Sequence, residues 1–322
     1  MTVRTSSVIE RRGVPLSLKI FLSVSLLASV VLVTGFSPSV ASASSTSSVI
    51  NAVAAENQYA NVLSQIGGKY VKVTSILNNP NTDPHTYEAS PSIAQSVGRS
   101  QLIVQNGVGY DSFMNNIEAA SPNPKRKVIV VQHVLKLPDS TSNPHLWYNP
   151  TTMPAVAKVM ASDLSALAPN HRVYFQSRLT AFDTSLQPWL RAVASFKAKY
   201  AGTKVAVTEP VADYLLQAMG AKILTSFVFQ ADVMNGVDPS PEDITLEKGY
   251  FTKHQAKVFC YNEQVVSSLT VAIRQSARAN NVAVVGVYET MPTPGYNYQT
   301  WMLAEVNAIQ KAVVDHTSTQ KL

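Results

Sequence analysis

Cysteine is almost absent from this chain of 322 residues, and its single copy, Cys260, allows neither an intrachain disulfide nor a thiolate metal cluster. Cys260 lies in the apolar segment 257–261, which predicts a buried strand in which the thiol is a small core residue. The sequence also lacks a His-Glu-x-x-His motif, which many zinc peptidases use to bind their metal. The first absence excludes a metal site built from several thiolates, and the second weakens the case for a metallohydrolase.

A convincing membrane span is lacking as well. The apolar run 20–33 is interrupted by serines and is short of the about 20 residues that a span needs. Basic residues precede this run, and small residues after it would allow cleavage after Ala41 or Ala43, which predicts a secretory signal peptide over 1–43. A retained anchor is the alternative. With no cysteine near the cleavage region, we expect no lipid anchor.

Charge of either sign is sparse, at 14% of residues, and the net charge is +6. Four basic residues and one acidic residue within positions 1–43 account for +3, which leaves +3 for the rest of the chain. A charge this small and dispersed argues against nucleic acid as a partner.

The length suggests about two domains. In both halves short apolar strands alternate with helical segments, which predicts parallel βαβ units. In the first half we expect strands at 49–53, 70–77, 102–104 and 128–131, and helices at 57–66, 91–98 and 151–167. In the second half we expect strands at 204–208, 223–227, 258–260 and 282–288, helices at 211–219, from 240 onward and at 298–314, and a loop at 230–239.

Between the halves, apolar residues recur at steps of three and four, which predicts one amphipathic helix. They are Phe175, Leu179, Phe182, Leu186, Leu190, Val193, Phe196 and Tyr200. About 30 residues would give a helix about 45 Å long, and we expect Pro188 to kink it. Such a helix would join the halves stiffly; an ordinary surface helix of one domain is the alternative.

Two similar segments, 83–87 and 143–147, each place a histidine directly after a proline. Proline fixes its own backbone and restricts the residue before it, so His85 and His145 leave a stiff segment in a defined direction. Each could be a turn histidine packed on an aromatic neighbour. The repetition favours a pair of metal ligands.

Glu209 and Glu289 each follow a predicted apolar strand of the second half, at the edge where open α/β sheets bind ligands. Each could instead be a carboxylate at a helix start. With His85 and His145 they would form a neutral set of two imidazoles and two carboxylates, which suits Zn²⁺ or Mn²⁺ better than Ca²⁺ or Mg²⁺. His133, at a strand end, is the competing ligand. The other histidines are expected near helix ends: His171, His254 and His316.

Taken together and in this order, the motifs resemble the metal-binding solute-binding proteins of bacterial zinc/manganese ABC importers, the adhesin-like family of cluster A-I. The resemblance rests on segments 81–91 with 106–107, 143–147, 207–209 and 288–292, and it covers essentially the whole chain after the leader. It implies two Rossmann-like α/β lobes joined by one long rigid helix. It further implies one metal ion in the interlobe cleft, ligated at His85, His145, Glu209 and Glu289, and delivered to a membrane permease.

On this basis we expect a signal peptide at 1–43, an N-terminal lobe at 44–168, a connecting helix at 169–200 and a C-terminal lobe at 201–322. The mature protein should be a periplasmic or extracellular monomer, and not an enzyme. A secreted metallohydrolase, or an adhesin that uses the same scaffold without metal, is the alternative.

Three features depart from the family pattern. Asn143 replaces the usual aspartate before the second histidine, so we expect a looser orientation of His145. Glu209 is typical of manganese members, whereas Glu289 with the residues after it resembles zinc members. A His-rich acidic loop, common in zinc members, is missing from the sequence. The choice between Zn²⁺ and Mn²⁺ therefore stays open.

Overall fold

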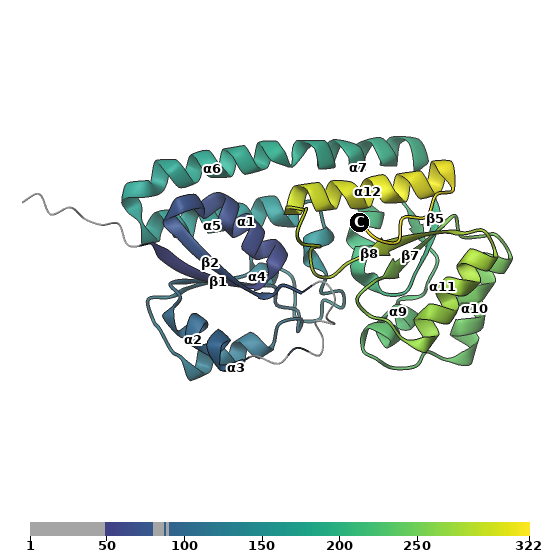
Figure 1. Cartoon of the computed structure of the whole chain (residues 1–322), viewed down its shortest axis with the longest axis horizontal. Helices are drawn as coiled ribbons and strands as arrows, with labels where there is room; N and C mark the ends of the chain where they lie inside the picture. Colours follow the sequence, from purple (N-terminus) through teal and green to yellow (C-terminus); the bar gives the residue numbers. More distant parts are fainter. Residues whose placement is uncertain (1–48, 80–86, 88–89) are drawn as a thin grey trace, which may run out of the picture. The chain divides into compact units, whose positions relative to one another are not determined.

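The computed structural model describes residues 49–79, 87 and 90–322. The described residues form two parallel four-stranded sheets, sheet A in the first half of the chain and sheet B in the second (Figure 1). This confirms the two α/β lobes expected from the alternation of strands and helices. The predicted signal peptide, 1–43, lies outside the described residues.

Sheet A has the strand order β2-β1-β3-β4, and every neighbouring pair is parallel. Its lobe comprises β1 (Ile50–Glu56), α1 (Asn57–Gly67), β2 (Val71–Leu77), α2 (Pro91–Arg99), β3 (Leu102–Gln105), α3 (Phe113–Ala120), β4 (Lys127–Val130), α4 (Val131–Val134) and α5 (Thr152–Leu167). Helices cover both faces of the sheet, so its central strands, β1 and β3, are apolar on both sides.

Sheet B repeats this order as β6-β5-β7-β8. Its lobe comprises β5 (Lys204–Val207), α8 (Asp213–Ala218), β6 (Lys222–Ile223), α9 (Phe227–Met234), α10 (Pro241–Thr252), β7 (Val258–Asn262), α11 (Ser268–Ala279), β8 (Ala283–Val287) and α12 (Tyr298–Asp315). In each sheet the strand order reverses between the first and third strands, and open α/β sheets bind ligands at the carboxyl ends of such a pair. Cys260 is buried within β7, as predicted.

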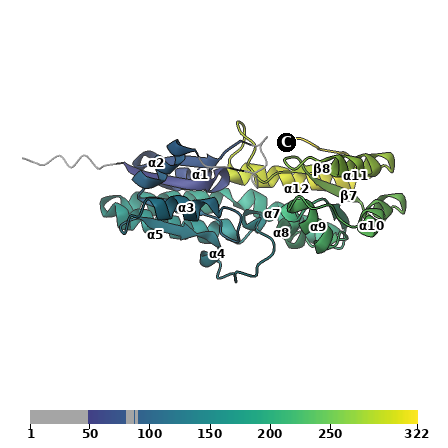
Figure 2. The ribbon, with the colours of Figure 1, turned by 90° about the horizontal axis from the view of Figure 1, so that it is seen from below.

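The predicted connector is two consecutive helices, α6 (Arg172–Ser185) and α7 (Gln187–Tyr200) (Figures 1 and 2). Helical hydrogen bonds continue through Leu186, whose N–H donates to the Phe182 carbonyl. The break falls two residues before Pro188, because proline lacks the N–H that would bond to the preceding turn. Helix α6 packs on α1 and α5, and α7 on α8 and α12. Among the described residues, no helix is both long enough and apolar enough to cross a membrane.

Four aromatic residues at seven-residue spacing anchor the connector: Phe175, Phe182, Trp189 and Phe196. All four are buried within one continuous apolar core that includes strands of both sheets. The predicted face included three of them and missed Trp189, whose indole packs edge-on against Tyr298 of α12 at a centroid distance of 5.7 Å. The connector is thus a core element of both lobes.

One predicted strand is wrong. Of residues 223–227 only Ile223 belongs to a strand, the two-residue β6, and helix α9 replaces the first half of the predicted loop 230–239. The apolar run around Phe227 resembles a strand in sequence, but Ser226 caps a helix by accepting a hydrogen bond from the Phe229 N–H at 3.2 Å. Helices α3 and α11 are further additions to the predicted pattern.

A short tail segment pairs with the outer strand of sheet B. Thr319 forms a parallel bridge with Val285, its N–H donates to the Val284 carbonyl, and its carbonyl accepts from the Gly286 N–H. A side chain at position 286 would collide with the Gln320 carbonyl. Glycine at this position therefore permits the tail to lie against β8.

Candidate metal centre

The candidate ligands lie at the carboxyl ends of strands and in the loop before α5. Glu209 follows β5 by two residues, and Glu289 follows β8 by two. His145 immediately precedes a short 3₁₀ helix, Leu146–Tyr148. All three side chains are buried.

His145 is held in one orientation by Asn143. The Asn143 Oδ1 accepts a hydrogen bond from the His145 N–H at 3.0 Å and lies 2.9 Å from the ring Nδ1. An amide oxygen only accepts, so in the neutral ring Nδ1 carries the proton and Nε2 presents its lone pair. Nε2 lies 3.4 Å from the Glu289 Oε2.

Asn143 makes a further contact beyond those to His145. The remaining amide group, Nδ2, donates to the Pro210 carbonyl at 2.8 Å. Pro210 directly follows Glu209, so one amide joins the histidine loop to the glutamate turn of the other lobe. An aspartate has no N–H to make this contact.

Glu289 is fixed through both its backbone and its carboxylate. Its N–H donates to the Gln264 Oε1 at 2.6 Å. Its Oε2 accepts from the Tyr110 hydroxyl at 2.9 Å, and its Oε1 accepts from the Asn262 Nδ2 at 2.8 Å. Donors from both lobes therefore hold this carboxylate in place.

Asn262, the last residue of β7, connects the two glutamates. Its Nδ2 also donates to the Glu209 Oε2, at 3.2 Å. The structure thus brings His145 and Glu289 into direct contact and links Glu209 to them through one amide. A direct cluster of three or more His, Cys, Asp or Glu side chains suited to a metal is not found within the described residues. The fourth predicted ligand, His85, lies outside them.

The remaining histidines have the ordinary positions expected of them. His133, the competing ligand candidate, is exposed on α4. His171 precedes α6 and stacks on the Tyr70 ring at a centroid distance of 3.7 Å. His254 and His316 are exposed at the ends of α10 and α12, both with left-handed backbone conformations.

Two polar residues on the first-lobe side, Tyr110 and Glu56, were not predicted from the sequence. Burial, followed by the Glu289 carboxylate, raises the pKa of Tyr110 well above its usual range, so its hydroxyl stays a donor. Glu56 ends β1, where burial and the nearby Asp111 carboxyl raise its pKa and favour the neutral acid. Glu56 could have been identified from its position, because a polar residue at the carboxyl end of a central parallel strand lies where open α/β sheets bind ligands.

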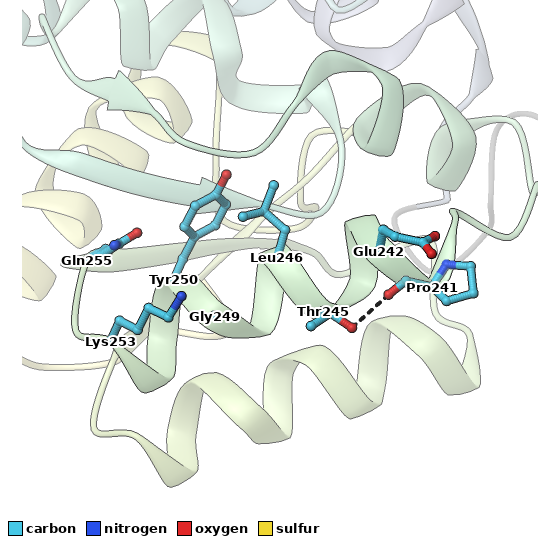
Figure 3. A pocket seen from close by; sticks show the side chains of 8 residues that line it. All are labelled: Pro241, Glu242, Thr245, Leu246, Gly249, Tyr250, Lys253 and Gln255. Carbon is cyan, nitrogen blue, oxygen red and sulfur yellow. Dashed lines mark hydrogen bonds between the residues drawn. The ribbon is translucent and has the colours of Figure 1, made fainter.

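A separate groove of about 430 Å³ runs along α10 between Pro241 and Gln255 (Figure 3). Its residues include one carboxylate, Glu242, and no histidine. It therefore offers none of the mixed nitrogen and oxygen ligands found between His145 and Glu289.

The donor set fits a divalent transition metal. An imidazole nitrogen and carboxylate oxygens face one another away from water, and Zn²⁺ and its neighbours accept this mixture of ligands. The hydrogen bonds that orient these groups are also present, since Asn143 orients the imidazole and Tyr110 and Asn262 orient the Glu289 carboxylate.

Comparisons with known proteins agree with this fold. The model of a family described as zinc-uptake complex component A, periplasmic, matches residues 52–312. The manganese-binding lipoprotein MntA of Bacillus subtilis is 27% identical over 145 residues, which are 43% of this chain and 47% of MntA. The zinc-binding protein TroA of Treponema pallidum is 24% identical over 115 residues, 34% of this chain and 37% of TroA. The matches thus span about half the length of the curated relatives, or less.

Solved structures show the same fold. The structure of the periplasmic zinc-binding protein TroA from Treponema pallidum has a TM-score of 0.66 and 17% identity, over 83% of this chain and 98% of that one. A crystal structure of ZnuA has a TM-score of 0.66 and 19% identity, over 82% of this chain and 99% of that one.

Proposed function

Because the chain belongs to the family of periplasmic zinc-uptake component A, we propose that it captures one divalent transition-metal ion outside the cytoplasm and delivers it to an ABC permease. It is a binding protein and not an enzyme. The observation that carries the proposal is the buried contact of His145 Nε2 with Glu289 Oε2, with Glu209 joined to it through Asn262.

The proposed ligands are His85, His145, Glu209 and Glu289. The last three support the proposal by lying in one buried hydrogen-bonded network at the ends of parallel strands. The cargo is Zn²⁺ or Mn²⁺, one ion per chain, since relatives are named for each metal. The names of these curated relatives concern metal binding, so we favour neither a metallohydrolase nor a metal-independent adhesin.

Further parts of the proposal come from the sequence. Residues 1–43 act as a signal peptide that is cleaved after Ala41 or Ala43, so the protein works in a periplasm or outside the cell. It works there as a monomer. The lobes are 44–168 and 201–322, with 169–200 as the connector. The permease is the partner that receives the metal.

Calorimetric titration of metal-free protein with Zn²⁺ and with Mn²⁺ tests the central claim. We expect one saturable ion per chain, and we expect affinity to rise with pH because protons compete for the imidazoles. His145→Ala should weaken binding at least a hundredfold, whereas His133→Ala, on the exposed face of α4, should leave it unchanged. Failure of either metal to saturate the unaltered protein would disprove the proposal.

A further inference from the structure

Asn262 occupies a place between the two proposed carboxylate ligands that the binding proposal does not explain. Its side chain is fully buried at the carboxyl end of β7. The Nδ2 group donates to one oxygen of Glu209 at 3.2 Å and to one oxygen of Glu289 at 2.8 Å. An amide NH₂ has two hydrogens, so each carboxylate receives one.

The orientation of this amide is set by its surroundings. Its Oδ1 accepts from the Gln264 N–H at 3.0 Å, and a flipped amide would lose that bond. The Asn262 N–H donates to the Thr208 Oγ1 at 3.1 Å, and its backbone pairs with Val287 of β8. These contacts hold the NH₂ group towards the two carboxylates.

This arrangement leaves one oxygen of each carboxylate without a bond to Asn262. On Glu289 that oxygen is Oε2, which faces the His145 Nε2. Chelation by both oxygens would require Oε1 to turn from the amide towards the same ion. Single-oxygen binding by Glu209 and Glu289 keeps both amide contacts.

We propose that Asn262 is a positioning residue that sets metal selectivity, by limiting Glu209 and Glu289 to one metal-binding oxygen each. This limit removes the two further oxygen ligands that chelating carboxylates would supply, which suits the low coordination number of Zn²⁺ and disfavours Mn²⁺, an ion that prefers six ligands. This inference rests on the proposed function, and it names the preferred cargo.

The first test uses the unaltered protein with Co²⁺ as a spectroscopic probe. Four-coordinate Co²⁺ absorbs visible light strongly and six-coordinate Co²⁺ weakly. We expect the strong spectrum, and the weak one from a bound ion would overturn the inference while leaving the binding function intact. Because no residue is changed, the result does not depend on the folding of a variant.

The second test compares Zn²⁺ and Mn²⁺ dissociation constants for Asn262→Ala, with Asn262→Ser as a smaller change. We expect the preference for Zn²⁺ over Mn²⁺ to fall at least tenfold in both variants, because the carboxylates become free to chelate. Gln230→Ala is the matched control: it removes a buried amide of the same lobe that donates to the Thr225 carbonyl.

An unchanged preference for Zn²⁺ over Mn²⁺ in both Asn262 variants would overturn the inference. The proposed function would stand in that case, because the unaltered protein would still bind metal. Loss of all metal binding by the unaltered protein is a different result, and it would remove the proposed function together with the inference. Circular dichroism identifies a variant that has not folded, in which case the cobalt spectrum decides.

Discussion

At the scale of single residues, Asn143 performs two tasks with one amide. Its oxygen holds His145 in the tautomer that presents Nε2, and its nitrogen reaches the Pro210 carbonyl of the other lobe. A carboxylate at this position would accomplish only the first task. The asparagine therefore couples the direction of a ligand to the contact between lobes.

Two substitutions separate these tasks. Asn143→Ala should reduce metal affinity roughly 10- to 100-fold, the usual effect of losing a residue that orients a ligand. Asn143→Asp keeps an acceptor for His145, so we expect metal affinity to be kept and the free energy of unfolding to fall. Calorimetry and urea unfolding measure the two quantities. Equal losses of affinity in both variants would contradict this division.

Glu305 of α12 is a second informative residue. Burial raises its pKa to about 8, against smaller opposite effects of hydrogen bonds from Trp301 and Tyr148. The folded protein therefore keeps this proton between about pH 4.5 and 8, whereas the unfolded chain releases it. Folding stability should decline as pH rises through this window.

Replacing Glu305 by glutamine should remove the contribution of this residue to the decline, because glutamine keeps an acceptor and does not ionise. Each pKa unit of the shift corresponds to roughly 1.4 kcal/mol, so the stability of Glu305→Gln relative to the unaltered protein should increase by about 2 kcal/mol or more from pH 5 to pH 8. Urea unfolding at several pH values measures the difference in the free energy of unfolding between the two proteins. If the free energies of unfolding of Glu305→Gln and of the unaltered protein change equally with pH, the fold does not raise the pKa of Glu305.

At the scale of elements, the connector contributes more to the core than a surface helix would. Its four aromatics recur every seven residues and are buried, while Val173 on the same helix pair is 83% exposed. This pattern explains why α6 and α7 pack against helices of both lobes. The break at Leu186 costs little, since hydrogen bonds continue on both sides of it.

Trp189→Ala should lower the free energy of unfolding by about 3–5 kcal/mol, the usual loss for a buried large aromatic. It removes the packing partner of Tyr298 on α12. Val173→Ala on the exposed face should change stability by less than about 0.5 kcal/mol. Urea unfolding compares the two, and similar losses would mean that the aromatic face does not carry the connector.

Elements could be predicted from the sequence where the chain carries a local signal. The alternation of strands and helices predicted both sheets, and Pro91 and Ser240 marked helix starts that the structure confirms. Helix α9 was missed because its apolar run lacks helical periodicity, and its cap at Ser226 was overlooked. Asn262 and Tyr110 escaped notice because their partners are 27 to 179 residues away in the chain.

For the whole molecule, neutral groups tie the two lobes together around the loop of Glu289. The Asn57 side chain donates to the Met291 carbonyl at 2.8 Å and accepts from the Met291 N–H at 2.9 Å. The Tyr148 hydroxyl similarly bonds to both backbone groups of Tyr288. The backbone on either side of Glu289, a proposed ligand from the second lobe, is therefore fastened to the first lobe.

Asn57→Ala would leave both backbone groups of Met291 buried without partners. We expect a loss of about 2–4 kcal/mol in the free energy of unfolding, together with weaker metal binding as the Glu289 loop loosens. Asn235→Ala removes an exposed amide that bonds only within α9 and should have little effect on either quantity. Unchanged metal affinity in Asn57→Ala would mean that the loop is fixed by the second lobe alone.

The pairing of Thr319 with β8 has a consequence for how copies of this protein meet. Deletion of residues 317–322 would expose unsatisfied main-chain donors and acceptors along an outer strand, a template for addition of a foreign strand. Gly286→Ala should displace the same segment without shortening the chain. Light scattering should show that both variants self-associate and that the unaltered protein does not. Residues 317–322 would then protect the outer strand of sheet B against aggregation.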